Sequence, residues 1–265
     1  SVNDHVVTFD RNHLARILMF AAFAVLFYRS LRYRRYLVGY KRGKYNFTDI
    51  LSLNKMGWMV GLQMGLETAL FSITGIMIGW LGSIALAAHQ VMVAISTLGF
   101  MIYYGVGAAV SVRVSNYFGR QDLLHVRRTT MAGFHLILCL AVCACTVFLF
   151  SRELIGYLFT TSEEVIRVVS TLVYILLAYQ FGDALQITYA NSLRGIGDVI
   201  SMAVISFIGY FLIAMPVCYI CGFVLEWGIT GIWIGYPIGL TLTGVMLCGR
   251  YYWKLKTKTQ SKEFY

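Results

Sequence analysis

The longest stretch of the chain without a charged residue runs from residue 68 to residue 112 and is 45 residues long. A helix needs about 20 apolar residues to cross the hydrocarbon core of a bilayer, so this stretch is long enough for two crossings. A turn between them is expected at Gly79–Ser83, where two glycines flank Trp80 and Leu81. The chain is therefore expected to fold in a membrane.

Four more stretches extend this pattern. Residues 129–151, 199–225 and 227–249 contain no charged residue, and residues 168–193 contain only Asp183. We predict six membrane spans, at residues 56–79, 85–112, 129–151, 168–193, 199–222 and 229–249. The apolar run from Ile17 to Tyr28 that precedes them is short for a span, and we expect it to be the end of a helix whose beginning is shortened or cut off.

Composition agrees with an all-α integral membrane protein. Hydrophobic residues make up 58% of the chain, and charged residues make up 13%, about half the share in an average soluble protein. So few charges cannot cover a globule of this size with solvated surface. A soluble enzyme and a nucleic-acid binder are therefore excluded.

The basic residues predict how the chain is oriented. When the connections between spans are taken alternately, 18 of the 22 Lys and Arg residues fall on one side. Lys and Arg accumulate on the cytoplasmic side of membrane proteins. The C-terminus is therefore predicted to be cytoplasmic, in a multi-pass protein of the inner membrane. The net charge of +10 follows from this topology and needs no nucleic-acid partner.

Two of the twelve acidic residues, Glu67 and Asp183, lie inside the predicted spans. A carboxyl group at mid-depth is costly unless it faces a cavity or a partner, so it indicates a functional site. Glu67 is the twelfth residue from the cytoplasmic end of its span and Asp183 the eleventh. At about 1.5 Å per residue both lie roughly 16 to 18 Å into the membrane. The two carboxyl groups are therefore expected to meet at one site.

Other polar side chains share the helix faces of these acids. Offsets of three, four, seven or eleven residues return to the same face of a helix. Gln63 and Thr74 meet this rule with Glu67, and Tyr179 and Gln186 meet it with Asp183. We predict a small hydrated cavity that binds a proton or a small cation, with no cofactor and no metal other than Na⁺. A pair of protonated, hydrogen-bonded structural carboxyls is the alternative.

Several short strings together resemble the multidrug and toxic compound extrusion (MATE) family, in its bacterial NorM-like branch. The resemblance covers about residues 50–253. The strings are Ala87-Ala88-His89-Gln90, Gly99-Phe100-Met101-Ile102, Gly105-Val106-Gly107-Ala108-Ala109, Ser111-Val112-Arg113-Val114, Leu193-Arg194-Gly195-Ile196-Gly197-Asp198 and Gly228-Ile229-Thr230-Gly231-Ile232-Trp233.

The resemblance implies a cation-coupled exporter with two six-helix lobes around a substrate cleft. In that frame, residues 1–50 are the end of the last helix of the first lobe and a basic cytoplasmic link. Residues 51–253 are the second lobe, and residues 254–265 are a cytoplasmic tail. The missing first lobe is then a partner of this chain. The resemblance also places the coupling ion, Na⁺ or H⁺, at Glu67, Asp183 and Tyr179.

The substrate that the resemblance implies is a bulky organic cation, a drug or a toxic metabolite, exported by alternating access. Aromatic rings attract cations through their π faces. The expected contacts come from the first, second and fourth predicted spans. They are Phe71, Tyr103, Tyr104 and Tyr179.

Two other functions compete with this one. Gly195-Ile196-Gly197-Asp198 resembles the Gly-x-Gly-Asp string of intramembrane aspartyl proteases, but Asp198 is expected in a cytoplasmic connection and Asp183 lacks a preceding tyrosine. A lipid-linked sugar flippase of the same superfamily is the second alternative. Such a protein is expected to have a cleft rich in Arg, and Lys and Arg occur only at the ends of the six spans.

Overall fold

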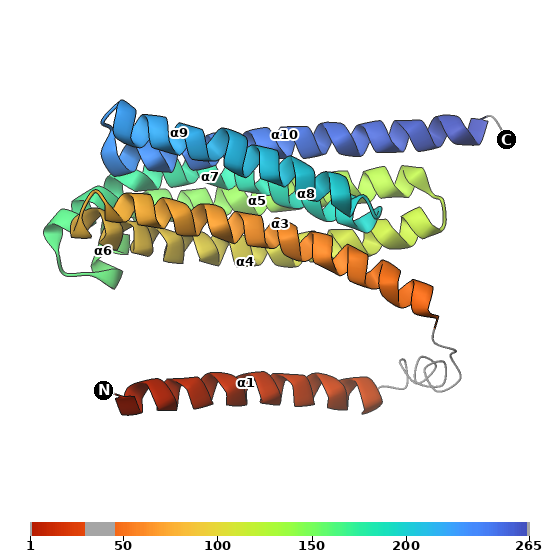
Figure 1. Cartoon of the computed structure of the whole chain (residues 1–265), viewed down its shortest axis with the longest axis horizontal. Helices are drawn as coiled ribbons and strands as arrows, with labels where there is room; N and C mark the ends of the chain where they lie inside the picture. Colours follow the sequence, from red (N-terminus) through yellow and green to blue (C-terminus); the bar gives the residue numbers. More distant parts are fainter. Residues whose placement is uncertain (1, 30–45, 264–265) are drawn as a thin grey trace. The chain divides into compact units, whose positions relative to one another are not determined.

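The computed structural model describes residues 2–29 and 46–263, which belong to two compact units divided after Leu53 (Figure 1). Most of the predicted basic link, residues 30–45, lies outside the described residues. In the first unit, helix α1 (Val2–Arg29) is longer than the apolar run Ile17–Tyr28 because the polar residues before the run also join the helix. The side chains of Phe20 and Phe23 are exposed.

The second unit is a bundle of long helices. In the residues described, six helical segments are long and apolar enough to cross a membrane, which confirms the predicted all-helical membrane lobe. The elements are α3 (Phe47–Gly79), α4 (Ser83–Gly119), α5 (Leu123–Phe150), the short α6 (Arg152–Phe159), α7 (Glu163–Gly195), α8 (Val199–Phe207), η1 (Ile208–Ala214), α9 (Met215–Tyr219), η2 (Ile220–Val224) and α10 (Gly228–Glu263). Elements α8 to η2 together make the fifth crossing.

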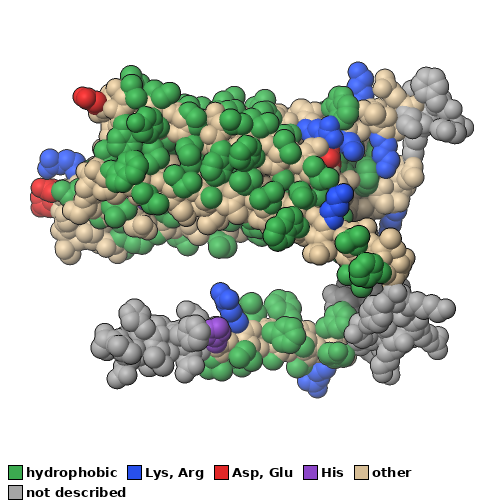
Figure 2. Space-filling view, viewed as in Figure 1, with side chains coloured by type: hydrophobic (Ala, Val, Ile, Leu, Met, Phe, Trp, Pro, Cys, Tyr) green, Lys and Arg blue, Asp and Glu red, His purple; other side chains and the backbone are tan. Residues whose placement is uncertain are grey.

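The helices extend past the predicted spans, most of all at the end where Lys and Arg gather. The last span was predicted to end at residue 249, whereas α10 continues to Glu263. Polar residues there continue the helix because good helix formers such as Lys need no apolar surroundings. Figure 2 shows apolar side chains along the flank of the second unit, with Lys and Arg gathered near the end where α10 finishes. The chain is a multi-pass membrane protein.

Helix α7 forms the centre of the bundle. It packs against α4, α5, α6 and α10, and its largest buried side chains include Leu172 and Leu176 (Figure 1). The contacts of α7 with these four helices position Asp183 inside the bundle.

The tight turn before α4 contains Gly82, whose φ of 111° is a conformation that favours glycine, so the predicted turn at Gly79–Ser83 is confirmed.

Proline disturbs only one of the two helices that contain it. Pro216 lies in α9, between the π-helical segments η1 and η2, so the fifth crossing is irregular, as the missing N–H donor predicts. Pro237 lies inside α10, which remains continuous around it.

Two glycine stripes with the same four-residue spacing have different surroundings. On α10, Gly231, Gly235 and Gly239 pack against the fifth crossing, where an added Cβ would meet Cys221, Cys218 and Ala214. On α3, Gly57, Gly61 and Gly65 have no atom within 4 Å of the position of a Cβ among the residues described. Among the described residues, close packing on a glycine stripe is therefore found on α10 and not on α3.

Candidate functional site

The two intramembrane acids come from different helices and lie close enough for their charges to interact. Asp183 is fully buried in the middle of α7, and neither of its carboxyl oxygens has a hydrogen-bond partner among the described residues. Glu67 is half-buried on α3 and accepts a hydrogen bond from Gln63 Nε2 at 3.3 Å. The structure thus brings together two carboxyl groups that are 116 positions apart in the chain.

Two tyrosines adjoin the acid pair. Tyr179, one turn before Asp183, is buried and interacts electrostatically with both carboxyl groups. Tyr210 of η1 is fully buried, accepts a hydrogen bond from Gln186 Nε2 at 2.8 Å, and its hydroxyl also contacts Glu67. Sequence reasoning missed Tyr210. The depth count that paired the acids would have found it, because Tyr210 is the twelfth residue of its crossing.

Arg194 brings a positive charge to the site. Its guanidinium donates to Gln63 Oε1 and to Asn191 Oδ1, each at 3.4 Å, and its charge interacts with Glu67. The sequence analysis placed Arg194 at the end of its span and did not include it in the site. A long side chain reaches back along its helix, which span boundaries alone do not reveal.

Glu67 borders two pockets. The smaller, about 20 Å³, has room for a water molecule and is lined by Gln63, Glu67, Tyr104, Gln186 and Arg194, among others. The larger, about 270 Å³, is lined mainly by apolar groups, with polar side chains at a few positions. Its lining includes Met64, Glu67, Phe71, Ser96, Thr97, Phe100 and Tyr179. Glu67 therefore faces space that water or a ligand can enter.

Two of the predicted residues lie away from these pockets. Thr74 is two turns beyond Glu67, about 10 Å along the helix, and its hydroxyl is hydrogen-bonded to the hydroxyl of Tyr236 at 2.5 Å. Tyr103 is 1% exposed and packs with Ile137 and Ala184. Neighbouring helix residues point about 100° apart, so Tyr103 cannot share the face of Tyr104. Phe71, Tyr104, Gln63 and Gln186 do line the pockets.

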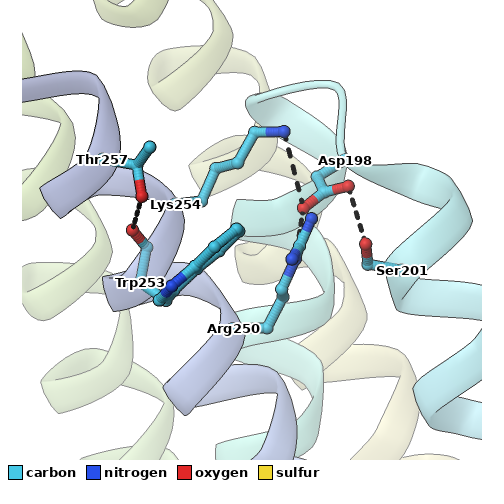
Figure 3. A network of polar contacts seen from close by, with 6 residues as sticks. All are labelled: Asp198, Ser201, Arg250, Trp253, Lys254 and Thr257. Carbon is cyan, nitrogen blue, oxygen red and sulfur yellow. Dashed lines mark hydrogen bonds and ion pairs between the residues drawn. The ribbon is translucent and has the colours of Figure 1, made fainter. Parts of the chain in front are cut away.

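Asp198, the acid of the Gly-x-Gly-Asp string, serves another purpose (Figure 3). It accepts hydrogen bonds from Arg250 Nε at 2.7 Å and Ser201 Oγ at 2.9 Å, and Lys254 Nζ lies 3.9 Å away. Burial favours a raised pKa for Asp198, but these hydrogen bonds and charges outweigh it and hold the pKa below its ordinary value. An ionised, ion-paired carboxylate cannot donate the proton that an aspartyl protease needs. Asp198 instead ties the turn after α7 to α10.

Comparison with known families decides what kind of protein contains this site. The family model described as MatE matches residues 60–220, which is more than half of the chain. The chain belongs to the MatE family. The matched region contains Glu67, Tyr179, Asp183 and Tyr210.

Relatives of this MatE chain include two bacterial proteins. The multidrug resistance protein NorM of Photobacterium profundum is 34% identical over 220 residues, covering 81% of this chain and 47% of the relative. NorM of Aliivibrio fischeri is 31% identical over 248 residues, covering 92% and 54%. The chain spans about half the length of the curated relatives that it matches.

Solved structures show the same MatE fold. The eukaryotic MATE transporter AtDTX14 superposes with a TM-score of 0.79 at 19% identity, over 91% of this chain and 56% of that chain. A MATE in complex with MaL6 gives a TM-score of 0.81 at 14% identity, over 93% of this chain and 56% of that one. Both similarities extend over most of the described residues.

Proposed function

We propose that this chain is the second lobe of a secondary active transporter that exchanges Na⁺ or H⁺ for bulky organic cations. The observation that carries the proposal is the acid pair, in which a fully buried Asp183 without hydrogen-bond partners lies within charge range of Glu67. Unpaired carboxyl groups inside a membrane protein mark an ion pathway. The alternative, a pair of structural carboxyls, requires hydrogen bonds to Asp183 that are absent from the described residues.

The acid pair supports coupling because its members belong to different helices. A cation that binds both Glu67 and Asp183 draws α3 toward α7, and its departure leaves two carboxyl groups that repel each other. An ion drives transport only if it binds the two access states with different affinity. The separation between α3 and α7 is the quantity that differs between the states. Tyr210 contacts Glu67, and Tyr179 interacts electrostatically with both acids, so the surroundings of both tyrosines change with this separation.

The substrate site is the pocket of about 270 Å³ beside Glu67. Phe71 and Tyr179 supply aromatic rings and Glu67 supplies a carboxylate, which suits an organic cation. Tyr104, at the neighbouring small pocket, is a further contact. Competition between substrate and ion for Glu67 couples their movements. The partner lobe completes this pocket.

The partner is a first lobe of the same transporter, with which residues 51–253 form the substrate cleft. Residues 1–50 supply the end of its last helix and the basic link, and residues 254–265 form a cytoplasmic tail. The relatives support this division because the chain matches about half of each. The lobe lies in the inner membrane, with the C-terminus in the cytoplasm.

A lipid-linked sugar flippase fits the site less well. Recognition of a phosphate-linked sugar calls for several basic groups. Arg194 is the only basic residue among those that line the two pockets at Glu67, and its guanidinium is bound to Gln63 and Asn191. The site therefore has a carboxylate where a flippase needs free positive charge.

Efflux in membrane vesicles tests the proposal. The chain is expressed together with its first lobe in a bacterial host that lacks its own drug exporters, and ethidium movement is followed after a Na⁺ or proton gradient is imposed. We expect Glu67→Gln and Asp183→Asn each to reduce ion-driven transport at least tenfold, because neither amide can bind the ion by charge. Glu164→Gln, an exposed position on the helix of Asp183, is the control and should transport normally. Normal transport by both site variants would overturn the proposal.

A further inference from the structure

Asp183 has a second set of polar neighbours, on the side that faces α4. Gln180 of α7 and Tyr103 of α4 are 0% and 1% exposed. Neither amide atom of Gln180 has a hydrogen-bond partner among the described residues, nor does the Tyr103 hydroxyl or either carboxyl oxygen of Asp183. None of the roles derived above uses Gln180, and Tyr103 does not line the pockets at Glu67.

The packing of α4 on α7 places these groups at one level. Both helices cross the bundle in the same direction, since α5 runs between them. A Cβ placed on Gly99 would meet the Gln180 amide at 3.0 Å, and one on Gly107 would meet Ile187 at 2.9 Å. Tyr103 is halfway between the two glycines, so it lies beside Asp183 and Ala184.

Two contacts agree with this register. Tyr103 packs with Ala184 and Ile187 in one buried cluster, and its hydroxyl lies within the range of the Asp183 charge. Gly99 leaves the space that the Gln180 amide occupies. The two residues lie on facing helices, Tyr103 at the level of Asp183 and Gln180 within one turn of it.

Buried polar atoms without partners are rare in folded proteins and signal a bound water or ion. Four of the atoms here are oxygens: the two of Asp183, Gln180 Oε1 and the Tyr103 hydroxyl. A hard cation binds a shell of such oxygens, both charged and neutral. A proton bound to Asp183 is held by one carboxyl oxygen and can be shared with only one further acceptor, whereas a hard cation binds several oxygens at once. The number and kind of oxygens therefore favour a metal cation over a proton.

We propose that Gln180 and Tyr103 are ligands of the coupling ion at Asp183, and that they make this site selective for Na⁺. This inference rests on the proposed function and extends it, because it names the ion and adds two ligands on the α4 side of the pair. Glu67 and Tyr179 approach the ion from the other side. Na⁺ then bridges α3, α4 and α7, whereas a proton would join only the two acids.

Binding of radioactive ²²Na⁺ to the purified full chain in lipid nanodiscs at pH 8 tests the proposal. Gln180→Met keeps the size of the side chain and removes its oxygen, and Tyr103→Phe removes only the hydroxyl. We expect each change to weaken Na⁺ binding at least tenfold and Asp183→Asn to abolish it. Gln90→Met and Tyr219→Phe make the same chemical changes at exposed positions and should bind like the unaltered chain.

The outcomes separate the two proposals. Loss of binding in Asp183→Asn together with unaltered affinity in Gln180→Met and Tyr103→Phe would overturn this inference and leave the proposed function standing. If the unaltered chain binds no ²²Na⁺ but takes up protons in a way that depends on Asp183, this inference is likewise overturned and the proposed function stands. If Asp183 binds neither Na⁺ nor a proton, the proposed function is overturned as well.

A separate variant covers the case in which Gln180→Met does not fold, judged by circular dichroism and elution volume. Gln180→Glu keeps an oxygen at the same position and adds charge, so it should bind Na⁺ at least as tightly as the unaltered chain. Folded Gln180→Glu with tenfold weaker binding would contradict a ligand at this position.

Discussion

The aspartates at positions 183 and 198 have opposite surroundings although both are largely buried. Asp198 is held by Arg250, Ser201 and Lys254, whereas Asp183 has no hydrogen-bond partner among the described residues. A paired carboxylate has little free energy to gain from binding a further cation, and an unpaired one has much. The same residue type therefore fastens two helices together at one position and remains available for an ion at the other.

The contribution of Asp198 to stability depends on pH. Its pKa in the folded chain is below the ordinary value, so its contribution is fully present above about pH 4 and is lost as the pH falls through the folded pKa. We expect Asp198→Asn to destabilise the chain by about 1 kcal/mol at pH 7, a value reduced for the partly exposed partners. Thermal unfolding in detergent at pH 7 and pH 3 measures the effect.

The difference between Asp198→Asn and the unaltered chain should shrink at pH 3, where the carboxyl group begins to be protonated. Glu164→Gln, at an exposed position, should unfold like the unaltered chain at both pH values. A loss of stability that is equal at both values would show that the ion pair is not its cause.

At the residue scale, Glu67 and Asp183 stood out as candidate site residues because charged residues are scarce inside the spans. Counting residues from the ends of the spans gave their similar depth. Tyr210, Gln180 and Arg194 were missed. Tyr210 belongs to a crossing without an acid, so no charge drew attention to it, and the reach of the Arg194 side chain depends on its rotamer, which the sequence does not contain. Gln180 lies three residues before Asp183, an offset that returns to the same helix face, so the spacing could have indicated it.

At the element scale, spacing predicts a helix face but not what covers it. The glycine stripes of α3 and α10 have the same spacing, yet only the α10 stripe has a helix packed on it. The six spans were predictable because the length of an apolar run has to match the thickness of a bilayer. Helix pairing was not predictable, because small residues permit close approach without specifying the partner.

The two stripes give a matched pair of substitutions. At Gly231 an added methyl group meets the backbone carbonyl of Cys221, which cannot move aside, so we expect Gly231→Ala to destabilise the chain by about 1 to 3 kcal/mol. At Gly61 there is nothing within 4 Å, so Gly61→Ala should be neutral or slightly stabilising. Unfolding curves of the two variants in detergent provide the comparison. Equal losses would mean that the α3 stripe is covered as well.

At the scale of the whole molecule, the number of crossings determines whether the two ends of the second unit lie on the same side of the membrane. Six crossings return the chain to the side from which it started, so the beginning of α3 and the end of α10 lie on one side of the membrane. Most of the Lys and Arg residues among the described part of this unit belong to that side. Their asymmetry is what predicts that this side is cytoplasmic.

Reporter fusions test the orientation. Green fluorescent protein fused after Tyr265 should fluoresce, because it folds in the cytoplasm, and alkaline phosphatase at the same position should be inactive. Fusions in the connection at residues 160–162 should give the opposite pair of results, since that connection lies at the other end of α5 and α7. Active phosphatase at the C-terminus would reverse the proposed orientation.

The unequal packing of α3 and α7 has a mechanical consequence. Asp183 is on a helix enclosed by α4, α5 and α10, whereas Glu67 is on a helix that few other backbones approach among the described residues. Helix α3 contacts α7 and α10 through side chains, such as Gln63 with Arg194 and Thr74 with Tyr236. Separating the two carboxyl groups by moving α3 breaks fewer contacts than moving α7. Under the proposed function, α3 is therefore the helix that we expect to move first when the ion binds or leaves.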